Sequence, residues 1–333
     1  MITPKTTIAE VIAEQEWSKY QKYMIYGGKT KEEAPINRMR SASLESLADI
    51  GWSPEGIAAG LNFFLGAIRE ERVQQYFVYE DTTDDPLKAD VNFIHISPKE
   101  KDREKPMIIL CAGGGYQSVC TMVEAIPTAR HLIELGYEVF LFTYRVNVFN
   151  AAQKALDDLA AGIEYLYKHK EEMGISSNDY AIGGFSAGAN LISNWGSSRL
   201  GYGYYQLPKP LCMFPVYTYI DLKAIAEEKN KIGILVNMFG ASWKDRIDEF
   251  QVTEQINDKY PPCYIVCGKN DTTVACVNSE IMEKKLEEAG VIVVLEEGEE
   301  AQHGFGDGTG TDVEGWPKRA INFMENLLLL KQS

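Results

Sequence analysis

Residues 184–188, Gly-Phe-Ser-Ala-Gly, hold a serine in a pattern that is typical of an activated nucleophile. Residues 179–183 predict a short buried strand before the serine, and the apolar spacing over 187–195 predicts a helix after it. A chain that passes from strand to helix so abruptly crowds the backbone at the serine, so its neighbours must be small, as the two glycines are. We therefore expect the Ser186 hydroxyl to be exposed above a sheet. An ordinary Gly/Ser turn is the alternative.

A nucleophilic serine needs a base, and the chain has four histidines. His95 lies in an alternating segment that predicts an edge-type strand, so we expect a half-exposed side chain there. His131 and His169 lie in helix-like stretches, where solvated or helix-terminal side chains are expected. His303 follows the apolar residues 291–295 and precedes a final helix, which puts it in a loop at the carboxyl end of a strand. Because α/β folds place their chemistry at such ends, His303 is the predicted base.

The acid that orients this histidine should lie between the serine and the histidine in the chain. Residues 261–268 predict a buried strand, and Asp271 follows in the loop at its end. Its carboxylate would accept the imidazole N–H, fix the tautomer and stabilise the imidazolium. An aspartate in a solvated turn is the alternative. The other candidate acids are Asp307, Asp312 and Glu300.

A run of three glycines, residues 113–115, follows an apolar strand predicted over 107–111. Successive glycines let backbone N–H groups point inward without obstruction by side chains. Together with the N–H of Ala187, such a donor pair is the expected oxyanion hole. A glycine run can also hold phosphate. No Gly-Lys-Ser/Thr follows, however, and no second glycine pattern fits a dinucleotide, so phosphate binding is the minor alternative.

With serine, acid, histidine and glycine loop in this order, the chain resembles the α/β-hydrolase superfamily, and more narrowly the acetyl-esterase and lipase branch related to hormone-sensitive lipase. The resemblance covers residues 88–330 and rests on short stretches in the family's order and spacing. These stretches are residues 113–116, 124–127, 144–146, 184–188, 260–262, 271–274, 278–279 and 303–304.

The resemblance implies a role for individual residues. Ser186, Asp271 and His303 match the family's catalytic triad. The matching oxyanion donors are Gly114, Gly115 and Ala187, and Tyr116 is a candidate substrate-binding residue. The chain departs from the family at Ala112, which stands where the family has a histidine that usually braces the oxyanion loop.

The remaining pattern predicts an α/β-hydrolase fold: a mostly parallel, eight-stranded sheet with helices on both faces. The expected strands are 75–80, 91–97, 106–111, 138–144, 179–185, 211–216, 263–267 and 291–296. Residues 1–72 predict a helical extension that either closes over the site or serves as a brace or dimer contact. Residues 73–333 form the expected catalytic domain, in which the long connection 217–259 predicts a cap-like insertion.

Composition limits the class of protein. The chain has 333 residues, of which 45% are hydrophobic and 24% charged, as in a globular protein with a sizeable core. A net charge of −15 disfavours binding to nucleic acid or to an anionic membrane. The first residues lack the features of a signal peptide, so a cytoplasmic location is expected. Cys263 and Cys267 share one face of a predicted strand, which favours free buried thiols over zinc ligands.

These observations together predict acyl transfer to water through an acyl-enzyme, without a metal or an organic cofactor. The resemblance implies a carboxylesterase for short acyl chains, with acetylated sugars or other small esters as substrates. An amidase or peptidase with the same triad and a non-catalytic binding protein of the same fold are the alternatives. The expected partner is a small ester, and self-association is left open.

Overall fold

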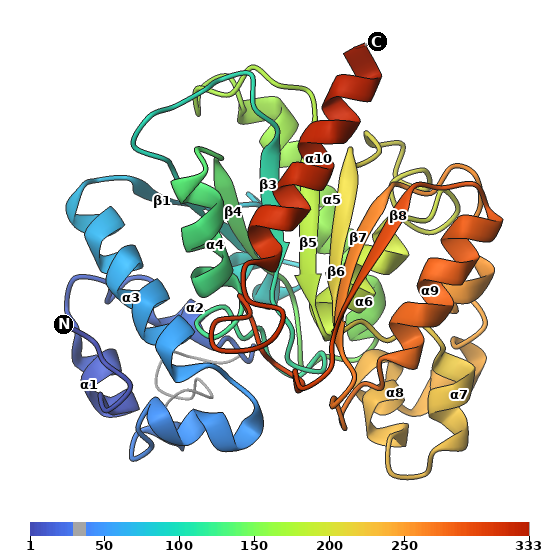
Figure 1. Ribbon diagram of the computed structural model, residues 1–333, viewed down its shortest axis with the longest axis horizontal. Coiled ribbons are helices and arrows are strands. Elements are labelled where there is room, and N and C mark those ends of the chain that lie inside the picture. Colours follow the sequence, from blue (N-terminus) through green and yellow to red (C-terminus); the bar gives the residue numbers. More distant parts are fainter. Residues whose placement is uncertain (29–37, 333) are drawn as a thin grey trace.

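Within residues 1–28 and 38–332, which the computed structural model describes, eight strands form one sheet (Figure 1). The strands are β1 (Val73–Phe77), β2 (Asn92–Ile96), β3 (Met107–Cys111), β4 (Val139–Thr143), β5 (Tyr180–Phe185), β6 (Cys212–Val216), β7 (Cys263–Gly268) and β8 (Val293–Gly298). Their order in space is β1-β2-β4-β3-β5-β6-β7-β8. β2 runs antiparallel to both of its neighbours, and every pairing from β4 to β8 is parallel.

The strands from β2 to β7 are buried along their whole length, whereas the two edge strands β1 and β8 are partly exposed. Near-continuous apolar runs such as Met107–Cys111 and Val139–Thr143 explain this burial, because helices cover both faces of a parallel sheet. In Figure 1, α4 (Ala125–Glu134) and α10 (Trp316–Gln332) cross the near face, and α5 (Ala151–His169) and α6 (Ala187–Trp195) lie behind. The predicted fold class is confirmed.

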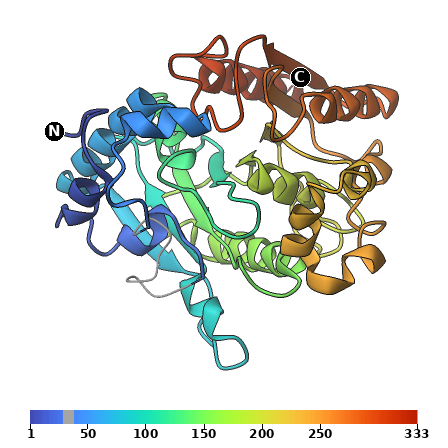
Figure 2. The same cartoon turned by 90° about the horizontal axis from the view of Figure 1, so that it is seen from below.

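Of the remaining helices, the one over Val277–Glu288 also packs on the sheet, against β7 and β8, and the others lie outside this central layer. The remaining helices are α1 (Ile8–Ala13), α2 (Gln21–Met24), α3 (Pro54–Arg69), α7 (Leu222–Glu227), α8 (Ile232–Phe239) and α9 (Val277–Glu288), with 3₁₀ turns η2 (Glu45–Ile50), η3 (Pro86–Asp90), η4 (Gly240–Asp245) and η5 (Val252–Glu254). Figure 2 looks onto the edge where the parallel strands end, with the N-terminal helices on one side and the segment of α7 and α8 on the other. This edge carries the chemistry described below.

Two helices near the N-terminus begin with residues suited to a helix start. Thr7 and Glu10 form a reciprocal capping box at α1, and the Ser53 hydroxyl accepts the third N–H of α3, which begins with proline. α3 packs closely on α4, since a Cβ added to Gly60 would lie 2.8 Å from the Cα of Pro127. The buried side chains of this N-terminal part belong to the same hydrophobic cluster as those of the sheet.

The prediction for His95 is wrong. Its side chain is buried rather than half-exposed, because β1 covers the outer side of β2 and so β2 is not an edge strand. The imidazole stacks on the Phe140 ring at 4.2 Å, and its Nε2 lies 2.7 Å from a Glu138 carboxylate oxygen.

The two edge strands also differ from the predicted ranges by two or three residues at their ends. Among the helices that the structure describes, none is both long and apolar enough to cross a bilayer.

Candidate active site

Ser186 occupies a sharp turn between β5 and α6, as the sequence predicts. Its φ of 51° and ψ of −115° are strained values for a residue with a side chain. A Cβ on Gly184 would lie 2.4 Å from the Gly188 carbonyl oxygen, and one on Gly188 would lie 2.0 Å from that of Cys111. Only glycine fits at either position, so the flanking glycines are what allows the serine to take this conformation.

His303 connects Ser186 to Asp271 by two hydrogen bonds. Its Nε2 lies 3.0 Å from the Ser186 Oγ, and its Nδ1 lies 2.7 Å from Oδ2 of Asp271. The other oxygen of Asp271 accepts the backbone N–H groups of Thr273 and Val274 at 2.8 Å each. The carboxylate is therefore held in its own loop and oriented toward the imidazole. An Nδ1–H that donates to Asp271 leaves Nε2 as the acceptor for the serine hydroxyl.

The alternative acids and histidines lie in other contacts. An Asp307 oxygen is 2.9 Å from Nε2 of His131, and Asp312 accepts the backbone N–H of Glu300 at 2.9 Å. His131 is thus paired with Asp307 rather than merely solvated. His169 ends α5, as expected for a helix-terminal residue. The structure therefore brings together the predicted serine, acid and base, and no other candidate acid is bonded to His303.

The glycine run lies directly against Ser186. A Cβ added to Gly113 would lie 2.8 Å from the Cβ of Ser186. Gly114 and Gly115 have φ values of 129° and 62°, which other residues rarely adopt. In the part of the chain that the structure describes, neither of their N–H groups donates to a protein acceptor. The N–H of Ala187 is the first of α6 and has no acceptor within its helix. All three groups are therefore available to an oxygen bound beside Ser186.

Comparison with family models places the chain in a known family. The BD-FAE model matches residues 94–286, which is more than half of the chain and includes the β5–α6 turn. The chain belongs to the BD-FAE family. The resemblance to the esterase and lipase branch of the α/β hydrolases is thereby confirmed.

Similar proteins and solved structures are consistent with this family and its fold. Endo-1,4-beta-xylanase B of Butyrivibrio fibrisolvens is 22% identical over 208 residues, which are 56% of this chain and 30% of that protein. The chain thus spans less than a third of the length of this curated relative. Among solved structures, the acetyl ester-xyloside bifunctional hydrolase of Caldicellulosiruptor lactoaceticus has a TM-score of 0.65 and 22% identity, covering 77% of this chain and 97% of its own. The carboxylesterase Cest-2923 of Lactobacillus plantarum has a TM-score of 0.62 and 16% identity, covering 76% and 97%.

A buried carboxyl group that sequence analysis did not assign lies beside this BD-FAE site. Glu124 directly precedes α4, and its Oε2 accepts the N–H of Gly113 at 2.5 Å. Its Oε1 accepts the O–H of Tyr217 at 3.0 Å. Burial raises the pKa of Glu124 to about 7, opposed by the Gly113 N–H, the nearby His303 and the Tyr217 hydroxyl. Glu124 stands in a stretch that carries the family resemblance, which was the available signal for it.

Tyr217 links this carboxyl group to the predicted base. It follows β6, and its ring centroid lies 4.7 Å from that of the His303 imidazole and 4.8 Å from that of Phe305. The Ser186 N–H donates to the carbonyl of the residue before it, Val216, at 3.0 Å. The Tyr217 ring therefore packs against one side of the His303 imidazole, and the Tyr217 hydroxyl is fixed by its hydrogen bond to Glu124.

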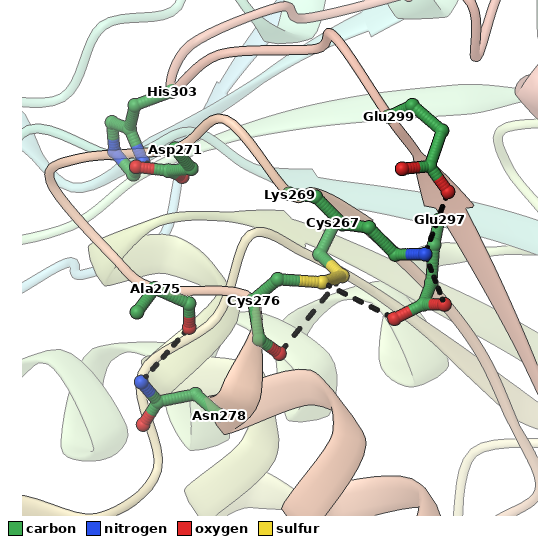
Figure 3. Close-up of a disulfide and its surroundings, with 9 residues drawn as sticks. All are labelled: Cys267, Lys269, Asp271, Ala275, Cys276, Asn278, Glu297, Glu299 and His303. Atoms are coloured by element: carbon green, nitrogen blue, oxygen red, sulfur yellow. Dashed lines mark hydrogen bonds and ion pairs between the residues drawn. A yellow bond between two sulfur atoms is a disulfide. The ribbon is translucent and has the colours of Figure 1, made fainter.

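The acid loop is closed by a disulfide that the sequence did not predict. Cys267, at the end of β7, is bonded to Cys276, so the expectation of a free thiol is wrong for Cys267 (Figure 3). The chain turns back after Asp271 and brings the two Cα atoms within 5.5 Å. Cys263 is free and buried, as expected. Among the described residues, the sole group of metal-type ligands is this cysteine pair with Glu297, and disulfide sulfurs are not thiolate ligands.

Tyr116 borders a hollow beside the glycine loop. Its own side chain is buried, and its hydroxyl donates to the Asn190 side chain of α6 at 2.9 Å. The hollow has a volume of about 300 Å³ and is lined mainly by amide and apolar groups. Its lining residues are Tyr116, Gln117, Asn147, Val148, Phe149, Val236, Asn237 and Gly240. The Gln117 amide donates to Asn237 of α8 at 2.9 Å, which ties the glycine loop to the segment 217–259.

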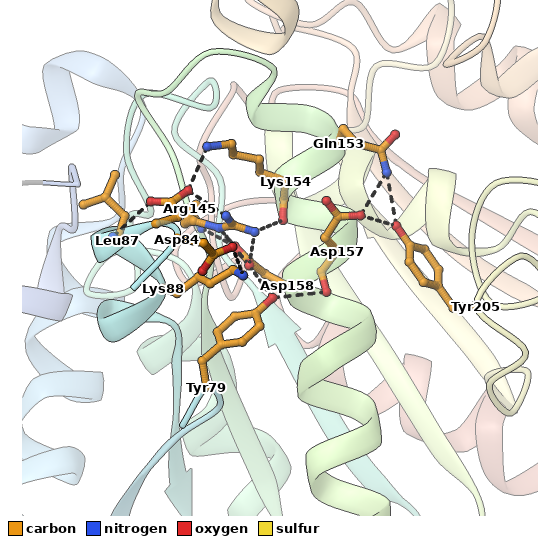
Figure 4. A network of polar contacts seen from close by, with 11 residues as sticks. Tyr79, Asp84, Leu87, Lys88, Arg145, Gln153, Lys154, Asp157, Asp158 and Tyr205 are labelled. Carbon is orange, nitrogen blue, oxygen red and sulfur yellow. Dashed lines mark hydrogen bonds and ion pairs between the residues drawn. The ribbon is translucent and has the colours of Figure 1, made fainter. Parts of the chain in front are cut away.

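The loop after β4 is anchored by a buried ion-pair network (Figure 4). Arg145 pairs with Asp158 of α5 at 2.7 Å and with Asp85 at 2.8 Å. Next to it, the Tyr144 hydroxyl donates to the carbonyl of Ala112 at 2.7 Å. The backbone at Ala112, where the resembled family has its bracing histidine, is thus held from the neighbouring strand.

Proposed function

We propose that this chain is a serine carboxylic-ester hydrolase that acts through an acyl-enzyme on short-chain acyl esters. The observation that carries the proposal is the pair of hydrogen bonds from Asp271 through His303 to the Ser186 Oγ, at 2.7 and 3.0 Å. The hydroxyl lies beside backbone N–H groups that meet no acceptor among the residues that the structure describes. A nucleophile, a base oriented by an acid, and donors for a developing oxyanion are the parts that acyl transfer requires.

In the proposed mechanism, Nε2 of His303 takes the proton from Ser186 while the serine oxygen attacks the ester carbonyl carbon. The carbonyl oxygen becomes an oxyanion that accepts N–H groups from Gly114, Gly115 and Ala187. Asp271 stabilises the imidazolium, which then gives its proton to the leaving alcohol. Water, deprotonated by the same imidazole, attacks the acyl-enzyme and releases the acid. Each step uses groups of this chain alone.

Acetylated sugars are the substrate class that we favour. Two of the similar proteins are named an acetyl ester-xyloside hydrolase and a xylanase, and another similar structure is of a carbohydrate esterase from gut microbiota. The hollow beside Tyr116 supports a neutral polar alcohol, because amide groups and an exposed Phe149 line it and none of its described lining residues is charged. Amides and aromatic rings are suited to the hydroxyls and the apolar faces of a sugar.

In our proposal, two segments outside the central sheet flank the active site. We propose residues 1–72 as an extension that flanks the His303 loop, since a Cβ on Gly51 would lie 2.1 Å from the His303 carbonyl oxygen. The insertion 217–259 is proposed to help form the alcohol pocket through Asn237. We further propose a cytoplasmic enzyme of net charge −15 whose partner is a small ester, rather than nucleic acid or membrane, with self-association open.

The proposal is tested with a fluorophosphonate probe and a pair of esters. The probe should label Ser186 of the full chain, identified by peptide mapping, and acetylated xylose and short p-nitrophenyl esters should be hydrolysed. Ser186→Ala should lose both labelling and hydrolysis while circular dichroism stays unchanged. Ser193→Ala is the matched control, because Ser193 is a buried serine on α6, the helix that follows Ser186, and its hydroxyl lies near that of Thr218.

Three results would contradict parts of the proposal. A folded chain that takes no label at Ser186 is not a serine hydrolase and fits a binding protein instead. Labelling together with faster cleavage of an amide than of the matched ester would make the chain an amidase. If short esters are cleaved but no acetylated sugar is, the proposed reaction stands and the proposed substrate class is wrong.

A further inference from the structure

Glu124 is a buried carboxyl group that the proposed mechanism does not use. Its side chain is 3% exposed, although a carboxyl group is rarely buried to this extent without a reason. Both of its oxygens are bonded to groups of the candidate site, namely the N–H of Gly113 and the O–H of Tyr217. A single side chain therefore joins the oxyanion loop to the residue that packs on the imidazole.

The first bond fixes which N–H groups of the glycine run remain for substrate. The Gly113 N–H is occupied by Glu124, while those of Gly114 and Gly115 meet no protein acceptor in the described chain. Gly113 is also the residue whose added Cβ would meet Ser186, at 2.8 Å, and the Glu124 Oε2, at 3.2 Å. A change in the position of Glu124 would therefore move the loop relative to the serine oxygen.

The second bond acts on the base. Tyr217 donates to Glu124 and presents its ring to His303 at 4.7 Å. The backbone next to Glu124 also supports the histidine loop, because Gly306 has a φ of 57° and a Cβ there would lie 2.9 Å from the Val123 carbonyl oxygen. Glu124 and Val123 thus contact both the glycine loop, which would bind the oxyanion, and the loop that carries His303.

We propose that Glu124 is a positioning residue that holds the oxyanion loop and His303 at the distances that acyl transfer needs, in the role that a histidine at position 112 has in the resembled family. This inference rests on the proposed esterase function. The ionisable groups around it are His303, Tyr217, Tyr144 and the Cys120 thiol. Glu124 does not touch the reacting atoms, so it acts through Gly113 and Tyr217.

The test compares Glu124→Ala with Glu124→Gln. Alanine removes both acceptors, and we expect kcat for a p-nitrophenyl ester to fall about 100-fold with little change in KM, since loss of one oxyanion donor costs about that much. Glutamine can accept the Gly113 N–H and donate to a rotated Tyr217 hydroxyl, so it should keep at least about a tenth of the parent kcat. The rate of fluorophosphonate labelling at Ser186 should fall in parallel, because it too needs the oxyanion donors.

Tyr217→Phe and Tyr137→Phe form the matched pair of controls. Tyr137 is also a buried tyrosine, and its hydroxyl donates to the Glu325 carboxylate at 2.8 Å. It precedes β4, however, and so lies at the amino end of the strands, away from the candidate site. We expect Tyr217→Phe to lose about tenfold in kcat and Tyr137→Phe to stay within about twofold, although each variant loses one hydrogen bond from a tyrosine hydroxyl to a carboxylate. A role in stability alone would give the two variants equal kcat.

Three results would overturn the role of Glu124. A folded Glu124→Ala with kcat within about threefold of the parent would do so, and so would a Glu124→Gln that is as slow as Glu124→Ala. If Glu124→Ala does not fold, equal kcat values for the two tyrosine variants overturn the proposal, and a selective loss in Tyr217→Phe supports it. A parent chain without hydrolysis or labelling refutes the proposed function itself, which is a separate outcome.

Discussion

Replacement of Glu124 by glutamine should change the pH dependence of stability in a direction that the structure predicts. Burial raises the pKa of Glu124 from its usual 4.5 to about 7, against the lowering effects of the Gly113 N–H, His303 and Tyr217. Between these two values the folded chain binds more protons at this group than the unfolded chain does. The free energy of unfolding of the parent therefore falls as the pH rises from 4.5 to 7, and the loss is complete above pH 7.

The magnitude follows from the difference between the two pKa values. At about 1.4 kcal/mol per pKa unit, the ionised carboxyl of Glu124 lowers the free energy of unfolding by about 3 kcal/mol in total. About 2 kcal/mol of this falls between pH 5.5 and pH 8. Glutamine keeps the shape of the side chain and does not ionise. The difference in stability between Glu124→Gln and the parent should therefore move by about 2 kcal/mol in favour of the variant over that range.

Urea unfolding at pH 5.5, 6.5 and 8, followed by tryptophan fluorescence, measures this difference. The range stays above the isoelectric point of about 4.9, where the net charge is lost. Glu325→Gln, which removes a carboxylate that accepts a tyrosine hydroxyl near the surface, is run in parallel. A stability difference for Glu124→Gln that is the same at all three pH values would contradict this prediction, because it would mean that Glu124 ionises alike in the folded and unfolded chains.

Three further substitutions test other parts of the structure. Asp271→Asn should lower kcat by up to about 10⁴-fold with the fold intact, because an amide favours the wrong tautomer of His303, and a steady-state assay would show it. Gly113→Ala should remove most activity and labelling, since its Cβ would lie 2.8 Å from that of the nucleophile; full activity would exclude the close approach. Asp158→Asn should lower the free energy of unfolding by about 3–5 kcal/mol by leaving the Arg145 charge short of a partner, and an unchanged urea midpoint would contradict this.

Most of the fold could be predicted because the signals are local. Strands such as β3 and β4 are continuous apolar runs, and each is followed by a helix with an apolar face. The candidate site residues lie in the turns and loops that follow such strands, and the carboxyl ends of parallel strands meet at one edge of a sheet. This is why Ser186, Asp271 and His303 could be chosen together although 117 residues separate the first from the last.

The wrong predictions concern contacts that depend on the order of the strands in the sheet or on the path of a loop. His95 could not be recognised as buried, because its burial requires β1 on the outer side of β2, and no local pattern states which strand lies outermost. Cys263 and Cys267 lie four residues apart in β7 and so share one of its faces, as predicted. The bond from Cys267 to Cys276 depends instead on the path of the intervening loop, which turns back to the end of the strand.

Ala112 shows how a missing side chain can be replaced from elsewhere in the chain. The resembled family braces the oxyanion loop with a histidine at this position, whereas here the backbone at 112 is held by the Tyr144 hydroxyl and the N–H of Gly113 by Glu124. Both residues follow the loop in the chain and approach it from a neighbouring strand or from the start of a helix. A carboxyl group has two oxygens, and Glu124 uses them to accept a backbone N–H and a tyrosine hydroxyl at once. If this is why a buried acid is retained at 124, the neutral variant should gain stability above pH 7 without gaining activity.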